Sequence, residues 1–226
     1  MWNEQIIMML LEGIKDTLYM TLTSTLIGYV IGLPMGILLT VTDKDGIHPN
    51  AAVYKVLDVI ANLIRSVPFL ILLIVLIPFT RFLIGRSYGP TATIVPLVIA
   101  AAPYIARMVE SSLKEVDAGV IEAARSMGAS NFTIVTKVML VEARTSLILG
   151  ATISLGTILG YSAMAGTVGG GGLGDIAIRY GYTRWQTDIM IVTVILLVIL
   201  FQIFQTIGMK LASNLDPVSY THLRAH

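Results

Sequence analysis

Cysteine is absent from the sequence, which excludes disulfides and thiolate chemistry. Its three histidines, His48, His222 and His226, are too scattered to suggest a metal site, and no metal or other cofactor is expected. Charge is also scarce, because charged residues make up 13% of the chain against about 25% in a typical soluble domain. A net charge of +1 gives no general basic surface, so no nucleic-acid partner is expected.

Motifs for chemistry are missing as well. The sequence has no G-x-x-x-x-G-K-[ST] loop, and the glycine run at 169–172 lacks the lysine and the hydroxyl that a phosphate cradle needs. No nucleophile and base are arranged as in an enzyme, so the chain is predicted to be no enzyme. The predicted spans hold no ionisable residue near their middle, which argues against a proton-coupled carrier. Any use of ATP must then depend on a partner.

Apolar residues dominate what is present. They make up 55% of the chain, and the mean hydropathy is +0.82, which indicates an integral protein of the lipid bilayer. Since about 20 apolar residues cross the hydrocarbon core, five stretches qualify as spans. They are 17–42, 59–80, 87–106, 145–174 and 189–209. The second carries Asn62 and Arg65 near its first end, from which a long basic side chain can reach the membrane surface.

The two ends of the chain are set apart from the transmembrane domain, which is predicted at 17–212. Residues 1–16 lack the basic start of a cleaved signal peptide, and their apolar residues fall at helical spacing. We expect an external segment that lies at the interface, although a helix packed on the protein's own spans fits the same spacing equally well. Residues 213–226 end in a stretch that resembles neither a span nor a cap and are interpreted as an artefactual tail.

The basic residues predict the orientation of the chain. With the N-terminus outside, ten lysines and arginines fall on the cytoplasmic side and five on the other side, which favours an outer N-terminus and a cytoplasmic C-terminus. Arg65 is counted here on the cytoplasmic side. Because the chain has an odd number of spans and no internal repeat, a pathway would form between two copies about a two-fold axis. A homodimer is therefore expected.

The longest polar segment is then cytoplasmic, and within it residues 117–142 predict two short helices. Asp117 is placed to cap the first helix, Gly128 to end it in the left-handed conformation, and Ser130 to cap the second. The small Ala123 and Ala124 would let another surface approach the backbone closely. An ordinary amphipathic hairpin with a solvated charged face fits the same residues.

A resemblance favours the first interpretation. The residues Glu122, Ala123, Ala124, Arg125 and Gly128, followed by Val138 and Leu140, are similar to the EAA loop of binding-protein-dependent ABC importer permeases, whose pattern is E-A-A-x-x-x-G, nine residues, then I-x-L-P. Two positions depart from the pattern, Val138 in place of isoleucine and Val141 in place of proline. The second departure leaves the end of the coupling segment less defined. In that family this segment is a coupling helix that docks on a separate ATP-hydrolysing subunit.

The resemblance extends over about residues 5–212 and is strongest to the methionine importer permeases. It rests on the stretches 65–69, 77–81, 102–110, 160–164 and 171–174. It implies an all-α, type I importer fold with five transmembrane helices and a cytoplasmic coupling helix between the third and fourth, in a bacterial inner membrane. It also implies two permeases, two ATP-binding cassette subunits and an external methionine-binding lipoprotein.

The fourth predicted span is the best candidate for the transport pathway, because it combines small residues with a few polar or polarizable ones. Tyr161, Ser162 and Met164 are predicted to lie on the pathway, with Met164 as a flexible gate. Packing between helices explains each of them equally well. Two other functions fit the chain, an importer permease for a polar amino acid or phosphonate, and a carrier that needs no ATPase.

Overall fold

The computed structural model describes residues 4–215, and within them every regular element is a helix. The main helices are α1 (Glu4–Thr42), α2 (Ala51–Ser66), α3 (Phe69–Val75), α4 (Ile77–Ile84), α5 (Pro90–Lys114), α6 (Ala118–Ser126), α9 (Arg144–Ala165) and α11 (Thr187–Leu215). Shorter pieces are α7 (Asn131–Thr133), the π-helix η1 (Ile134–Met139), α8 (Leu140–Glu142), the 3-10 turn η2 (Gly166–Val168), α10 (Gly172–Ile176) and the π-helix η3 (Ala177–Tyr182). The all-α prediction is confirmed.

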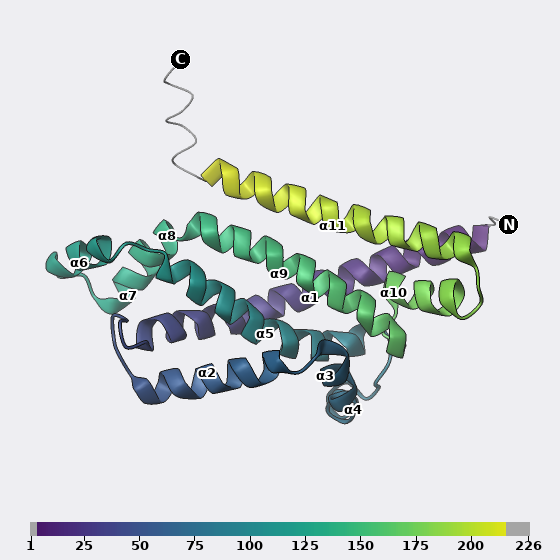
Figure 1. Ribbon diagram of the computed structural model, residues 1–226, viewed down its shortest axis with the longest axis horizontal. Helices are drawn as coiled ribbons and strands as arrows, with labels where there is room; N and C mark the ends of the chain where they lie inside the picture. Colours follow the sequence, from purple (N-terminus) through teal and green to yellow (C-terminus); the bar gives the residue numbers. More distant parts are fainter. Residues whose placement is uncertain (1–3, 216–226) are drawn as a thin grey trace, which may run out of the picture.

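Four helical segments are long and apolar enough to cross a membrane, namely α1, α5, α11 and the segment that begins with α9. The bent pair of α2 and α3 makes a fifth span if it is counted as one. The long helices lie side by side along the length of the molecule, with α6 at one end and the N-terminus at the other (Figure 1). This arrangement agrees with the five spans predicted.

The first span is a single helix of 39 residues. At 1.5 Å per residue it is about 58 Å long, well beyond the roughly 30 Å of a hydrocarbon core. The residues expected to form a separate interfacial segment continue into this helix from Glu4 onward, so their place at the membrane surface stays a prediction. The proposed tail likewise starts inside α11, which reaches Leu215, and its remainder lies outside the described residues.

The α1 and α5 helices make the most extensive helix–helix contact in the described part of the chain. Glycines at 28, 32 and 36 share one face of α1 and are buried against α5. A Cβ atom on Gly32 would stand 2.6 Å from the carbonyl oxygen of Ala102, so only glycine allows this approach. Small residues on a shared face are typical of helix packing in membranes, where van der Waals contact replaces the hydrophobic effect.

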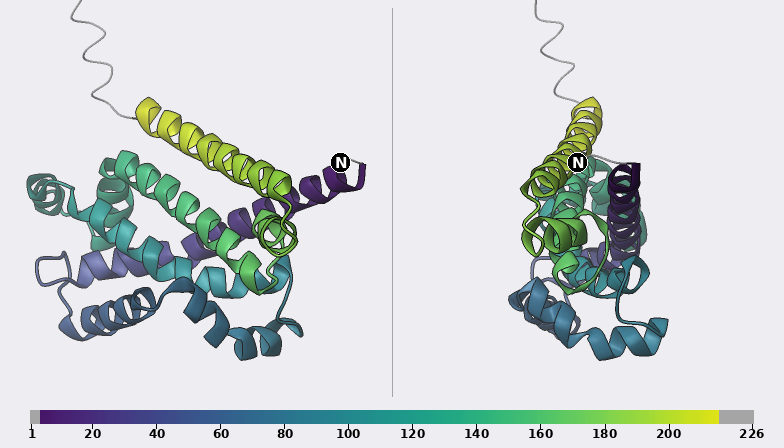
Figure 2. Two further views of the ribbon diagram at one scale, coloured as in Figure 1. Left: turned by 45° about the vertical axis from the view of Figure 1, so that its right-hand side comes forward. Right: turned by 90° about the vertical axis from the view of Figure 1, so that its right-hand side faces the viewer.

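The second predicted span differs most from expectation. A span is predicted at 59–80, but α2 begins earlier, at Ala51, and the chain turns by 101° between α2 and α3. Pro68 explains the break, because proline lacks an N–H group and disfavours a helical conformation in the residue before it. In the right-hand view of Figure 2, α3 and α4 lie across the direction of the long helices.

Candidate functional site

Local sequence signals determine the shape of α6. The Asp117 side chain accepts a hydrogen bond of 2.7 Å from the backbone N–H of Gly119, which caps the helix start. Gly128 follows the helix with a φ of +81°, a conformation that glycine adopts without strain. Ser130 then accepts from the Thr133 N–H at 3.2 Å and begins the next helix. The predicted caps and the terminating glycine are confirmed.

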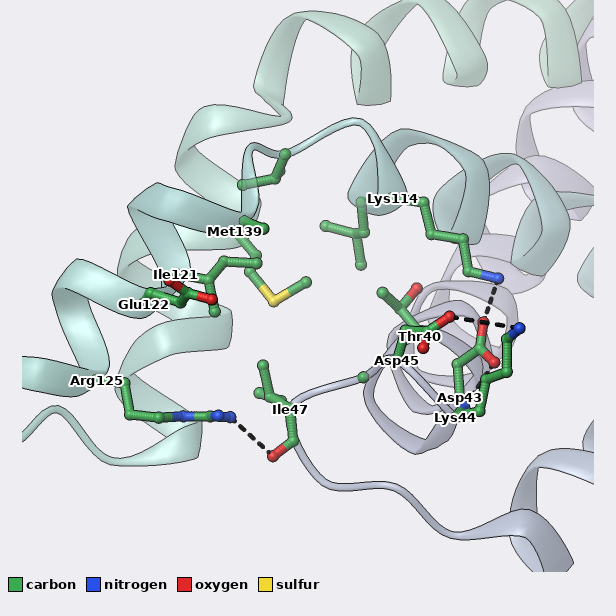
Figure 3. Close-up of a pocket in the computed structure, with 14 residues that line it drawn as sticks. Thr40, Asp43, Lys44, Asp45, Ile47, Lys114, Ile121, Glu122, Arg125 and Met139 are labelled. Carbon is green, nitrogen blue, oxygen red and sulfur yellow. Dashed lines mark hydrogen bonds and ion pairs between the residues drawn. The ribbon is translucent and has the colours of Figure 1, made fainter.

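Apolar packing and a hydrogen bond attach α6 to the rest of the chain, while most of its predicted contact residues stay exposed. Glu122, Ala123 and Gly128 are exposed, whereas Ala124 is buried in an apolar cluster with Ile134. Arg125 is also exposed, but its guanidinium donates a hydrogen bond of 3.1 Å to the carbonyl of Ile47 (Figure 3). The helix therefore presents a small-residue face to solvent and is tied to the loop between α1 and α2.

A pocket of about 600 Å³ opens beside this tie, between α6, the end of α5, η1 and the loop after α1. Glu122 and Arg125 line it from α6, and Lys114 lines it from α5 (Figure 3). Charges of both signs surround it, so the pocket has no marked preference for a ligand of one charge. Its place between α6 and the spans makes it the space that any movement of α6 would change.

A chain of ion pairs, which the sequence analysis missed, joins three elements next to this pocket. Arg107 pairs with Asp58 of α2 and, at 2.6 Å, with Glu110 of α5. Lys114 pairs with Glu110 at 2.8 Å and with Asp43, just after α1, at 2.6 Å. The helical spacing of Arg107, Glu110 and Lys114 along α5 was a signal for a charged stripe. The two other partners, Asp58 and Asp43, come from distant parts of the sequence.

The environment of Asp43 follows from this network. The hydrogen bond from the Lys114 ammonium group lowers the pKa of the Asp43 carboxyl, outweighing the opposite effect of its burial. Glu110, at the centre of the chain of ion pairs, is 5% exposed. Its two cationic partners compensate its burial, as a buried carboxylate requires.

The three predicted pathway residues of α9 point in different directions. Tyr161 stacks on Phe69 of α3, with ring centroids 4.5 Å apart and planes 6° from parallel. Ser162 is buried, donates to the Leu159 carbonyl at 2.7 Å and stands 3.5 Å from the Thr21 hydroxyl of α1. Met164 is 51% exposed. Ser162 thus packs between helices, Tyr161 is partly buried against α3, and Met164 is exposed.

The Tyr161 ring also lines a pocket of about 180 Å³ at the bend between α2 and α3. Phe69, Tyr104 and Arg65 line the same pocket. The sequence analysis placed Arg65 near the first end of its span, and this is wrong: α2 begins at Ala51, so Arg65 lies 14 residues, or about 21 Å, along it. Without Arg65 in the charge count, nine basic residues against five still favour the same orientation, which stays a prediction.

Among the described residues, no group of three or more histidine, cysteine, aspartate or glutamate side chains could hold a metal ion. The glycine-rich stretch that follows α9 folds back on the helix, since the Gly170 N–H donates to the Ala165 carbonyl at 3.0 Å. Gly171 and the neighbouring Gly169 both have positive φ. This stretch is a tight turn between α9 and α10.

Comparisons with known proteins identify the family that has this sequence and fold. Residues 28–217 match the family described as "Binding-protein-dependent transport system inner membrane component". The chain is 47% identical over 208 residues to the probable D-methionine transport system permease protein MetI of Vibrio cholerae, covering 92% of each chain. It is 51% identical over 164 residues to the D-methionine transport system permease protein MetI of Escherichia coli strain K12, covering 73% of this chain and 76% of the relative.

The fold also matches that of a solved structure. A structure described as inward-facing conformations of the MetNI methionine ABC transporter has a TM-score of 0.93 and 47% identity, and covers 95% of this chain and 100% of that one. An amino acid ABC transporter solved with histidines shares the fold, with a TM-score of 0.77 at 21% identity. The predicted type I importer permease fold is thereby confirmed. The chain therefore belongs to the binding-protein-dependent transport system inner membrane components, and is a multi-pass inner-membrane permease subunit of an ABC transporter.

Proposed function

We propose that this chain is the membrane subunit of an ATP-driven methionine importer and that two copies form the pathway, with two ATPase subunits and an external methionine-binding lipoprotein. The observation that carries the proposal is the 47% identity over 92% of both chains to a permease named for D-methionine transport. The like-folded MetNI transporter, named for methionine, supports the same substrate. The permease itself performs no covalent chemistry.

The coupling role is assigned to α6. Its exposed Glu122, Ala123 and Gly128 would meet a groove of the ATPase, and Ala124 and Arg125 would hold the helix to the spans. A helix with small exposed side chains allows close approach of a partner backbone, and a charged rim gives the contact its orientation. Closure of the two ATPases on ATP would then move α6 and, through it, the spans.

The pathway is assigned to α9 and its surroundings. Tyr161 and Met164 would line the pathway, with Met164 as a flexible plug, and Ser162 would hold α9 against α1. The orientation proposed is an outer N-terminus and a cytoplasmic C-terminus, which puts α6 on the side of ATP. The excess of lysine and arginine on that side supports it.

The test is uptake of labelled methionine into proteoliposomes that hold this chain, its cognate ATPase and its cognate binding protein. We expect uptake only when all three parts and ATP are present. Uptake by this chain alone would replace the importer with a carrier, and ATP-dependent uptake of another solute but not of methionine would refute the substrate.

A second variant set tests the coupling helix. Replacing Ala123 by tryptophan adds bulk to the exposed face of α6 and should uncouple ATP hydrolysis from uptake. Ser213→Trp, on the exposed end of α11, is the matched control and should transport normally. An Ala123→Trp transporter that assembles and imports at the rate of the control would remove the coupling role from α6.

A further inference from the structure

The pocket at the bend between α2 and α3 lies beside the apolar part of α5. Two of its lining residues, Ala100 and Tyr104, belong to this helix, which runs from Pro90 to Lys114. They come seven and three residues before Arg107, the first charged residue of the helix. At 1.5 Å per residue, they lie about 5–10 Å along the helix from Arg107, on the apolar side of the ion-pair chain.

Arg65 brings an unpaired charge to this pocket. No hydrogen bond or ion pair joins its side chain to any other residue in the described part of the chain, whereas the more buried Arg107 has partners on two helices. A charged side chain within a membrane span is unfavourable and marks a substrate or ion pathway when it faces a cavity. Arg65 lines this cavity, and its guanidinium fork suits a carboxylate in two-point contact.

Aromatic rings line the same pocket. The stacked pair of Phe69 and Tyr161 brings α3 against α9, and Tyr104 of α5 completes the wall. The Tyr104 hydroxyl lies 3.4 Å from the Thr157 hydroxyl, whose own proton goes to the Ile153 carbonyl at 2.9 Å. Aromatic rings favour both a thioether sulfur, about 5 Å away, and an ammonium group over the ring face.

We propose that this pocket is a transient binding site for the amino-acid zwitterion in the membrane, with the substrate carboxylate on Arg65 and the thioether side chain against Phe69 and Tyr161. This inference rests on the proposed methionine import. The volume of about 180 Å³ suits a ligand of amino-acid size, since sites for drug-sized ligands are about 300–1,000 Å³. A lipid phosphate is the other anion at hand, but its headgroup lies at the membrane surface, whereas this pocket lies beside the apolar part of α5.

The backbone geometry supports a substrate site at this place. The chain bends by 101° between α2 and α3, and Pro68 withholds an N–H group there. In the membrane, broken helices are tolerated where they are buried in protein or line a water-filled cavity. Because α3 carries Phe69 and α2 carries Arg65, a change in this bend would alter both halves of the pocket together.

Equilibrium binding measures this site without the external binding protein. The complex of this chain with its ATPase is placed in nanodiscs and titrated with labelled methionine and with methioninol, whose carboxylate is replaced by an alcohol; the ATPase alone is the blank. We expect methioninol to bind wild type about 10-fold or more weakly than methionine, the effect of one charge-assisted contact. Arg65→Gln should lower methionine affinity by that factor and leave methioninol binding unchanged, and Arg65→Lys should fall between.

Two further variants test the aromatic part of the site and control for a general loss of stability. Tyr161→Ala should weaken methionine and methioninol equally, because both carry the thioether; unchanged affinity for both would remove the aromatic half. Arg86→Gln changes an exposed arginine outside the long helices and should leave both affinities as in wild type.

The outcomes distinguish this inference from the proposed function. If Arg65→Gln weakens both ligands equally or neither, the carboxylate site is refuted. If the three-part system imports methionine but the permease and ATPase complex binds none above the blank, the site is refuted and the importer stands. If the three-part system fails to import methionine, the importer and the site fall together.

Discussion

Glu110 offers the sharpest test of the ion-pair chain that joins α1, α2 and α5. Its carboxylate is 5% exposed and accepts hydrogen bonds from Arg107 at 2.6 Å and from Lys114 at 2.8 Å. Replacing it by glutamine removes the negative charge between two cations and turns N–H donors of the new amide toward them. The perturbation is nearly isosteric, so packing changes little.

The size of the effect follows from the geometry. Removing one member of a buried ion pair typically costs about 3–5 kcal/mol. Arg107 keeps Asp58, and Lys114 keeps Asp43 and is 43% exposed, so water compensates part of the loss. We therefore expect a loss of about 2–3 kcal/mol in the free energy of unfolding. For a chain of this length that lowers the melting temperature by about 4–12 °C.

The assay heats the detergent-purified complex of tagged permease and ATPase and follows the loss of the monodisperse peak by size exclusion. Glu115→Gln is the matched control, because Glu115 is exposed and forms no ion pair in the described part of the chain. If Glu110→Gln melts within about 1 °C of that control, a change of well under 1 kcal/mol, the network does not stabilise the fold as argued.

Three other predictions follow from single contacts. Gly32→Ala should destabilise the chain by about 1–3 kcal/mol through overpacking against α5, measured by the same melting assay, whereas Gly160→Ala, where an added Cβ meets nothing within 4 Å, should not. The Lys114 hydrogen bond lowers the pKa of Asp43, so its stabilisation is present above the ordinary carboxyl pKa of about 3.9 and is lost as the pH falls through the lower folded value. A melting scan from neutral to acid pH should therefore show a smaller loss for Asp43→Asn, and an equal loss would contradict the assignment. Met164→Ala should alter uptake or basal ATPase; a variant with both unchanged would remove the gate role.

The sequence predicted the helices well where one local signal was sufficient. The caps at Asp117 and Ser130 and the terminating Gly128 are all found in the structure, because each acts on backbone groups two or three residues away. The α9 helix starts one residue before its prediction and ends at Ala165, short of the predicted 174, because the glycines beyond it make a turn. Hydropathy alone cannot separate an apolar turn from an apolar helix.

Other features depend on contacts between distant residues, and the sequence could not supply them. The partner of Arg107 on α2 is an example, since Asp58 lies 49 residues away. The start of α2 is a different case, because its signal is local: Asn50 caps the helix by accepting a 3.1 Å hydrogen bond from the Val53 N–H, nine residues before the predicted start at 59. Overlooking this cap placed Arg65 too near the start of its helix and hid the pocket at the bend.

The close contact of α1 with α5 also bears on how the molecule can change shape. Glycine faces packed against a backbone leave no side chain that could adopt another rotamer, so this pair has one arrangement and no near alternative. By contrast, α3 and α11 expose much of their apolar surface and touch fewer neighbours in the described chain. We therefore expect α1 and α5 to act as a stationary frame, with the opening of the pathway produced by elements that swing relative to it.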